Sequence, residues 1–292
     1  MRPVLSVHDA PPRHWVGDGF LVRSMLSHGV QGAAISPFIM LDHAGPMEFA
    51  PTSERRGVGQ HPHKGFETVT IVYDGAVEHR DSTGAGGVIG PGDVQWMTAA
   101  SGILHEEYHA PAFAAAGGRF EMVQLWVNLP AKDKSAPPGY QTLLDADIPV
   151  VTLPEGAGRL GVVAGRFGEA RGPARTFTPM NIWDLRLVRD GKMRLDVPEG
   201  HTLSLAVLDG TVEIDGHTIL RTGQTAVLGR EGGAVGVEAN GEAKLLVLTG
   251  EPIDEMVVAH GPFVMNSTEE IRQAMHDFRA GRFGTIRASE TA

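Results

Sequence analysis

The segment Thr68-Val-Thr-Ile-Val-Tyr-Asp-Gly-Ala-Val-Glu-His-Arg80 contains the pattern from which the fold can be predicted. β-Branched and aromatic residues fill its first half, as is typical of buried strands. Asp74-Gly75 then forms a sequence typical of a tight hairpin turn, and apolar and polar residues alternate after it. The segment therefore predicts two antiparallel strands joined by a short turn.

Further short strands follow this hairpin, with turn residues between them. Pro91-Gly92 marks a turn before residues 94–97, and residues 123–127 form another run typical of a buried strand. The 292 residues include 38 Gly and 19 Pro, which agrees with many tight turns. Short strands at this spacing predict an all-β fold, either a sandwich or a barrel.

The second half of the chain repeats this pattern. Residues 205–213 match residues 71–78, and residues 220–228 match residues 89–96. The two matches occur in the same order and at nearly equal offsets, which favours two tandem β modules over one large domain. The alternative is that hairpins with Asp-Gly turns resemble one another by chance.

The composition excludes several classes of protein. The chain has 25 Lys and Arg against 35 Asp and Glu, a formal net charge of −10, which disfavours direct binding to nucleic acid or to an anionic membrane. Because there is no cysteine, disulfides, iron–sulfur clusters and a cysteine nucleophile are excluded. Any metal must be held by imidazole and carboxylate groups, and the chain contains 13 histidines.

No targeting or membrane segment is expected. The first ten residues lack the continuous apolar run of a signal peptide. No stretch approaches the ~18 consecutive apolar residues that a membrane-spanning helix needs. We therefore expect a cytoplasmic protein without a membrane partner.

A helix is expected near the C-terminus. Ser267-Thr-Glu-Glu270 has the sequence of a capping box, and Ile271, Ala274, Met275 and Phe278 follow with helical spacing. Gly281 is a suitable C-terminal stop. The apolar stripe predicts a helix that packs against a sheet.

Two motifs point to a metal site. His61-Pro-His63 and His105-Glu-Glu107 each place two potential ligands two residues apart. In a strand such residues lie on the same face, about 7 Å apart at the backbone, so their side chains can converge on one ion. Together the motifs could supply three imidazoles and one carboxylate: His61, His63, His105 and Glu107.

This ligand set suits Fe(II), Mn(II), Ni(II), Cu(II) or Zn(II). Four protein ligands on an octahedral ion leave two positions for other molecules, which is typical of a catalytic or sensing site. The alternative is that these are ordinary histidines hydrogen-bonded to backbone groups. The repeat offers a comparison, because Asp196, Pro198 and Gly236 stand where the first module has its histidines. The β scaffold therefore does not require those histidines.

Several blocks in order resemble the pirin family: residues 61–68, 91–98, 102–107, 124–129 and 260–266. The resemblance implies a bicupin, two tandem jelly-roll β-barrels with a C-terminal α-helix. It implies an N-terminal metal-binding cupin domain at residues 1–130 and a degenerate C-terminal cupin domain, with the helix, at residues 131–292. The family's ligands fall on His61, His63, His105 and Glu107, and iron is the family's usual ion.

Glu67 offers a second carboxylate. Residues 61–67 also fit the general cupin motif, in which the glutamate is a metal ligand. In that case Glu107 would be free to act beside the metal or as a base. The pirin resemblance favours Glu107 as the ligand and leaves Glu67 as a buried carboxylate.

Three functions are compatible with this site. Pirins of this type resemble quercetin 2,3-dioxygenases, which open a flavonol ring with O₂; Glu107 or Glu67 would take the proton of the substrate hydroxyl. The second is a metal-binding regulatory protein that acts through protein contacts, as a transcription cofactor or an enzyme modulator. The third is a metal-binding cupin with a different substrate.

Two further histidines, His79 and His109, lie near these motifs in the sequence. The alternation of the hairpin is compatible with an outward-facing His79. His109 is expected either to extend the face of His105 and Glu107 or to lie in a loop.

Overall fold

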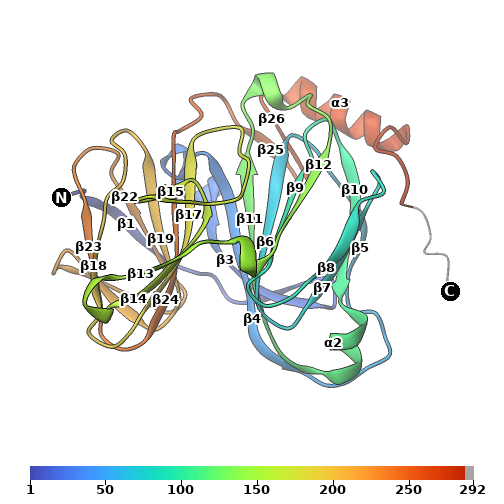
Figure 1. The fold of residues 1–292 in the computed structure, drawn as a ribbon. Helices are drawn as coiled ribbons and strands as arrows, with labels where there is room; N and C mark the ends of the chain where they lie inside the picture. Colours follow the sequence, from blue (N-terminus) through green and yellow to red (C-terminus); the bar gives the residue numbers. More distant parts are fainter. Residues whose placement is uncertain (287–292) are drawn as a thin grey trace. The chain divides into compact units, whose positions relative to one another are not determined.

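The computed structural model describes residues 1–286 of the chain (Figure 1). Contacts divide it into two compact units. Unit 1 comprises Met1–Pro12, Arg23–Leu41 and Ala146–Ile253, and unit 2 comprises Arg13–Val22, Asp42–Asp145 and the segment from Asp254 onward. Each unit is discontinuous in sequence, since the first residues belong to unit 1 and the last described residues to unit 2.

Unit 2 is built on two antiparallel sheets. The larger has the strand order β12-β9-β6-β11-β4-β3-β2, and the smaller has the order β5-β10-β7-β8. The division between the units falls within β3 and β4. The strands are β2 (His14–Val16), β3 (Phe20–Ser27), β4 (Phe38–Phe49), β5 (Gly57–His63), β6 (Phe66–Asp74), β7 (Val77–Asp81), β8 (Gly86–Ile89), β9 (Val94–Thr98), β10 (Ile103–His109), β11 (Gly118–Asn128) and β12 (Gly139–Leu143).

Unit 1 has the same plan. Its larger sheet has the order β1-β22-β19-β24-β17-β14-β13, its smaller sheet has the order β18-β23-β20-β21, and β15 pairs with β16. The strands are β1 (Val4–Asp9), β13 (Val150–Thr152), β14 (Gly158–Ala164), β15 (Arg166–Phe167), β16 (Ala170–Arg171), β17 (Met180–Leu187), β18 (Lys192–Leu195), β19 (Thr202–Asp209), β20 (Thr211–Ile214), β21 (Thr218–Arg221), β22 (Gln224–Leu228), β23 (Val235–Ala239) and β24 (Ala243–Gly250).

The strand orders agree with the repeat predicted from the sequence. The hairpin β6–β7 corresponds to β19–β20, and the following strands β8, β9, β10 and β11 correspond to β21, β22, β23 and β24. Gly75 and Gly210 occupy the same hairpin turn with φ of 80° and 86°, a conformation that favours glycine. The predicted all-β fold of two tandem β modules with a C-terminal helix is confirmed.

The division by contacts differs from a single cut between residues 130 and 131, which stays a prediction. The edge strand β1 pairs with β22 within unit 1, whereas the edge position of the corresponding sheet in unit 2 is taken by β12, which lies after residue 130. The segment after Asp254 belongs by its contacts to unit 2.

The last segment contains a two-stranded sheet and a helix. β25 (Val258–His260) pairs with β26 (Phe263–Met265), and α3 (Thr268–Arg279) follows. The Ser267 side chain accepts a hydrogen bond from the backbone N–H of Glu270, as the capping box predicts. Ile271 and Ala274 are buried in a cluster with Leu104 of β10, while Phe278 is 40% exposed. The helix therefore packs on unit 2 through most of the predicted stripe.

Short helical segments occur elsewhere. They are α1 (His28–Gln31), α2 (Pro111–Ala116) and four 3₁₀ turns at Gly32–Ile35, Ala131–Asp133, Asp145–Asp147 and Pro154–Gly156. Within residues 1–286, no helix combines the length and the apolar character that crossing a membrane requires.

Candidate metal centre

Three of the predicted ligands meet where β5 pairs with β10. His105 lies directly opposite His61 in the antiparallel register, and the register shifts between His105 and Glu107. The ring centroids of His61 and His105 are 4.1 Å apart, and those of His63 and His105 are 4.7 Å apart. One nitrogen from each of the three rings lies within 4.8 Å of the others. Strand pairing thus brings together the two motifs that the sequence separates by more than forty residues.

The nitrogens of these rings are available to bind a cation. His61 Nδ1 donates to the carbonyl of Gly59 at 2.8 Å. Within the described part of the chain, His63 Nδ1 and His105 Nε2 are buried and have no hydrogen-bond partner. Burial, followed by the neighbouring imidazoles, holds the pKa of both His63 and His105 well below the usual value. Neutral imidazoles with unused lone pairs fit a divalent transition metal.

Glu107 is adjacent to this cluster and shares His105 with it. Its carboxylate, together with His79 and His105, forms a second group whose potential ligand atoms lie within 4.8 Å of one another. Gln124 Nε2 donates to Glu107 Oε2 at 3.0 Å, and Thr70 Oγ1 donates to Oε1 at 3.5 Å. The carboxylate is therefore held from the opposite sheet, and it is buried.

His79 is a member of the site that the sequence did not identify. It is fully buried, so the outward-facing position considered for it is wrong. Its partner in the β7–β10 register is Glu107, and its ring stacks on Tyr140 with centroids 5.1 Å apart. Val77, His79 and Asp81 alternate on one side of β7 and are all buried. The apolar Val77 was the available signal, because it indicates which side of the strand faces the interior.

Glu67 lies elsewhere. It lies between Phe66 and Thr68 on β6, so its side chain points to the opposite face of the sheet from theirs. Its partner across the β6–β9 pair is Thr98. Its Oε1 accepts a hydrogen bond from Thr98 Oγ1 at 2.7 Å. Burial raises the pKa of Glu67 to about 7. Neither of the two groups around His105 contains this carboxylate.

The sheet face opposite the imidazoles is unusually polar. Thr68 and Thr70 of β6 pair with Trp126 and Gln124 of β11, and Thr70 also pairs with Gln95 of β9. Trp126 packs on the rings of His63 and Phe66, which shows that this face is directed at the site. Thr68 Oγ1, Trp126 Nε1 and both polar atoms of Gln95 are buried with no hydrogen-bond partner among residues 1–286.

Unit 1 has a different interior. The positions that match Thr68, Thr70 and Val72 in the repeat are Leu203, Leu205 and Val207, which belong to one apolar core cluster. Buried polar groups that lack partners are costly unless a ligand or water satisfies them. Among the described residues, the interior face of unit 2 therefore leaves polar groups that a ligand or water would satisfy, whereas the matching face of unit 1 is packed by apolar side chains.

The last segment of the chain pairs with the β5–β6 connection, next to His63. The backbone of Lys64 pairs with residues on both sides of Phe263, accepting from Val264 N–H and donating to the carbonyl of Pro262. Lys134 Nζ donates to the carbonyls of Gly65 and Val264 and to the Asn128 side chain. Burial lowers the pKa of Lys134 to about 8. Lys134 therefore ties the β5–β6 connection to β26.

His109 has a structural place. It follows Glu107 at the end of β10, and its Nε2 donates to the carbonyl of Gly19 at 2.9 Å. Its ring packs against Phe20, Phe49 and Phe120. It is a buried core histidine that extends the face of His105 and Glu107 on β10, which is one of the two positions predicted for it.

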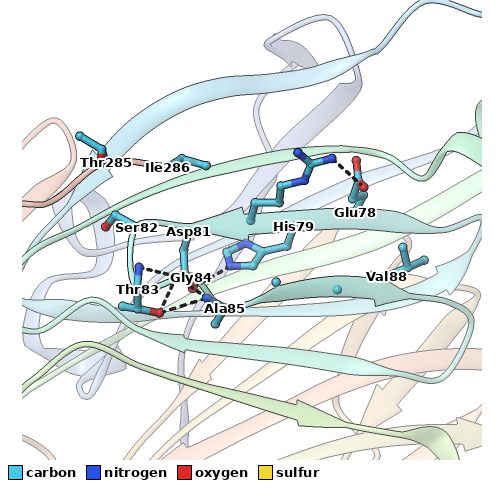
Figure 2. Close-up of a pocket in the computed structure, with 13 residues that line it drawn as sticks. Glu78, His79, Asp81, Ser82, Thr83, Gly84, Ala85, Val88, Thr285 and Ile286 are labelled. Carbon is cyan, nitrogen blue, oxygen red and sulfur yellow. Dashed lines mark hydrogen bonds and ion pairs between the residues drawn. The ribbon is translucent and has the colours of Figure 1, made fainter. Parts of the chain in front are cut away.

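A pocket of about 590 Å³ lies beside His79 (Figure 2). The β7–β8 hairpin lines it together with Thr285 and Ile286. Figure 2 shows the Asp81 carboxylate at its wall, with hydrogen bonds to Thr83 and Ala85.

Comparison with known proteins agrees with the resemblance in the sequence. The family model described as Pirin matches residues 19–127, and the model described as Pirin C-terminal cupin domain matches residues 182–284. A Pseudomonas aeruginosa protein named, provisionally, a quercetin 2,3-dioxygenase is 59% identical over 283 residues, covering 97% of this chain and 99% of that protein. Human pirin is 37% identical over 260 residues, covering 87% of this chain and 85% of that protein. A crystal structure of quercetin 2,3-dioxygenase from Acinetobacter baumannii is similar with a TM-score of 0.96 and 49% identity, covering 98% of this chain and all of that one.

Proposed function

The chain belongs to the pirin family, and from this premise we propose that it is a metal-dependent dioxygenase of the quercetin 2,3-dioxygenase type, acting on a flavonol. The observation that supports this most is the meeting of three imidazoles in unit 2, two of them with buried nitrogens that have no partner among the described residues. The similarity to proteins named as quercetin 2,3-dioxygenases supports the choice of reaction.

His61, His63, His105 and Glu107 would hold the ion, and Fe(II) is the ion we propose. The donor set of three nitrogens and one carboxylate also suits Mn(II), Ni(II), Cu(II) and Zn(II). When bound, the metal would supply Lewis-acid polarisation of a substrate hydroxyl and a redox centre for O₂.

The protein's own groups would bind the substrate and accept its proton. Glu107 is our candidate base, because its carboxylate adjoins the imidazoles and two neutral donors hold it there. As it is also a proposed ligand, it would take the proton by dissociating from the ion or by sharing the proton. Phe66 and Trp126 form an aromatic wall beside His63. The unused donors of Thr68, Gln95 and Trp126 would hydrogen-bond the oxygens of a polyphenol.

Oxygen consumption tests this proposal. Metal-loaded wild type is expected to consume O₂ when quercetin is added, and His63→Ala is expected to lose that activity. His217→Ala is the matched control, since His217 is exposed in a turn of unit 1. A loaded wild type that neither binds quercetin nor consumes O₂ would rule out the flavonol assignment, and the regulatory function would then be the one to pursue.

A further inference from the structure

A line of polar contacts leads away from the metal centre through His105. His105 Nδ1 lies 3.4 Å from His79 Nδ1, and His79 Nε2 lies 3.2 Å from Asp81 Oδ2. The other oxygen of Asp81 accepts from the backbone N–H and the hydroxyl of Thr83 at 2.8 and 2.6 Å (Figure 2). Asp81, His79 and His105 therefore form one continuous chain of hydrogen-bonding groups, which we call the relay.

The directions of these hydrogen bonds follow from the chemistry at the Asp81 end. An ionised carboxylate only accepts, so a His79 ring that carries a single proton must carry it on Nε2, the nitrogen that faces Asp81. Its Nδ1 is then an acceptor, and the facing Nδ1 of His105 must carry the proton of that ring. This assignment leaves the lone pair of His105 on Nε2, the nitrogen that is buried and has no partner within residues 1–286.

We infer that Asp81 and His79 are positioning residues that fix the tautomer of His105 and aim its Nε2 at the metal ion. The inference rests on the proposed metal site. A histidine ligand commonly donates its second N–H to an outer partner, which orients the ring and raises its basicity. Here that partner is a second histidine, itself oriented by a carboxylate.

Strand pairing sets the positions of these groups. The backbones of His105 and Asp81 are partners in the β7–β10 register, as are those of Glu107 and His79. The rings of His79 and Tyr140 are nearly parallel, at 16°. All three residues of the relay thus lie on β7 and β10, and the pairing of these two strands sets the positions of their backbones.

The same residues could be considered as ligands of a second ion, because His79, His105 and Glu107 form a compact group. If that ion used the His105 nitrogen that faces His79, it would need a lone pair on Nδ1 of His105. A neutral imidazole has only one unprotonated nitrogen, which the first site already uses. The relay therefore predicts no second ion on Nδ1 of His105, because that ion would require the neutral ring to lose its one remaining proton and become an imidazolate.

The tautomers can be measured directly in the metal-free wild-type protein. Ring-nitrogen NMR with ¹⁵N-labelled histidine is expected to place the proton of His105 on Nδ1 and that of His79 on Nε2. A proton on Nε2 of His105 or on Nδ1 of His79 would overturn the inference. Because this measurement needs neither metal nor variant, it is independent of whether the proposed activity is found.

A substitution tests the consequence for binding. In Asp81→Asn the amide can donate toward His79 Nε2, which reverses both tautomers and puts the His105 proton on Nε2. The affinity for Fe(II) or Zn(II) is expected to fall about 10- to 100-fold, as for other outer partners of metal ligands. Asp93→Asn is the matched control, because Asp93 accepts from backbone N–H groups in a turn of the same unit.

A pair of variants at the middle residue separates orientation from packing. His79→Asn can offer an amide oxygen to His105 Nδ1 and is expected to bind metal more tightly than His79→Leu. Equal affinities of these two variants, or wild-type affinity in Asp81→Asn, would contradict the relay. A second ion bound by His79 and Nδ1 of His105 would also contradict it while leaving the proposed function intact, whereas no bound ion would refute the proposed function itself.

Discussion

His61 and His105 are direct partners across the β5–β10 pair, with ring centroids 4.1 Å apart. Two imidazole rings gain little from such closeness, and in the described part of the chain two buried nitrogens of the cluster have no hydrogen bond. An ion that occupies the cluster would satisfy these nitrogens. We therefore expect a bound ion to stabilise the folded protein and its removal to lower the free energy of unfolding.

Metal removal is expected to lower the thermal stability of the protein. A ligand that binds only the folded state adds about 2.7 kcal/mol when its free concentration is 100 times Kd. Calorimetry of chelator-treated and reloaded protein should show a lower Tm for the former. His63→Ala should show no such response to metal; an equal response in that variant would mean that the ion binds elsewhere.

Replacing Gln124 by leucine is expected to weaken metal binding about 10-fold, because Glu107 would lose the amide that holds its Oε2. Competition with a coloured chelator measures the affinity. Gln224→Leu is the control, since that amide donates to the exposed Asp9 in unit 1. If both variants bind metal as tightly as wild type, Gln124 does not position the carboxylate.

Glu67 is expected to make stability depend on pH. Its pKa rises from 4.5 to about 7 on folding, so the folded state binds more protons between these values. The free energy of unfolding should therefore fall by about 1.4 kcal/mol for each pH unit as the pH rises through this range, about 3 kcal/mol in total. Above this range it should level off.

Glu67→Gln mimics the protonated acid and should remove this part of the slope. The variant is expected to be more stable than wild type at pH 8 and similar to it near pH 4.5. Urea denaturation at several pH values measures the difference between the two proteins, in which the other titrating groups cancel. Parallel curves for the two proteins would show that Glu67 stays ionised when folded.

Lys134→Met is expected to destabilise unit 2 by several kcal/mol. The lysine satisfies three buried oxygens, and each unsatisfied buried acceptor costs about 1–3 kcal/mol. Lys132→Met is a close control, because that side chain is 79% exposed two residues away. Equal midpoints of urea denaturation for the two variants would argue against a structural role for the buried ammonium group.

Much of the architecture followed from local patterns. Asp74-Gly75 and its repeat at Gly210 identified the hairpins, and alternation identified the strands. The spacing of the two motifs and the family resemblance predicted that His61 and His105 meet, but not that they are direct cross-strand partners, since that depends on which strands pair and in which register. The same holds for His79, whose place beside Glu107 is set by the β7–β10 ladder.

Other features depend on long-range contacts that the sequence pattern does not contain. The motif that includes Glu67 spans the end of β5 and the start of β6, and Gly65 between them has φ of 90°. The alternation of one strand therefore does not continue into the next, and spacing could not tell which face Glu67 occupies. Nor could it assign α3 to unit 2, because helix capping and amphipathicity identify a helix without its partner.

The account depends on a metal ion bound among His61, His63, His105 and Glu107. Anomalous diffraction from a crystal of the metal-loaded protein, collected at the absorption edge of the added metal, tests this most directly. We predict one strong peak per chain, within bonding distance of nitrogens from all three imidazoles. A peak away from these residues, or no peak at full metal loading, would contradict it.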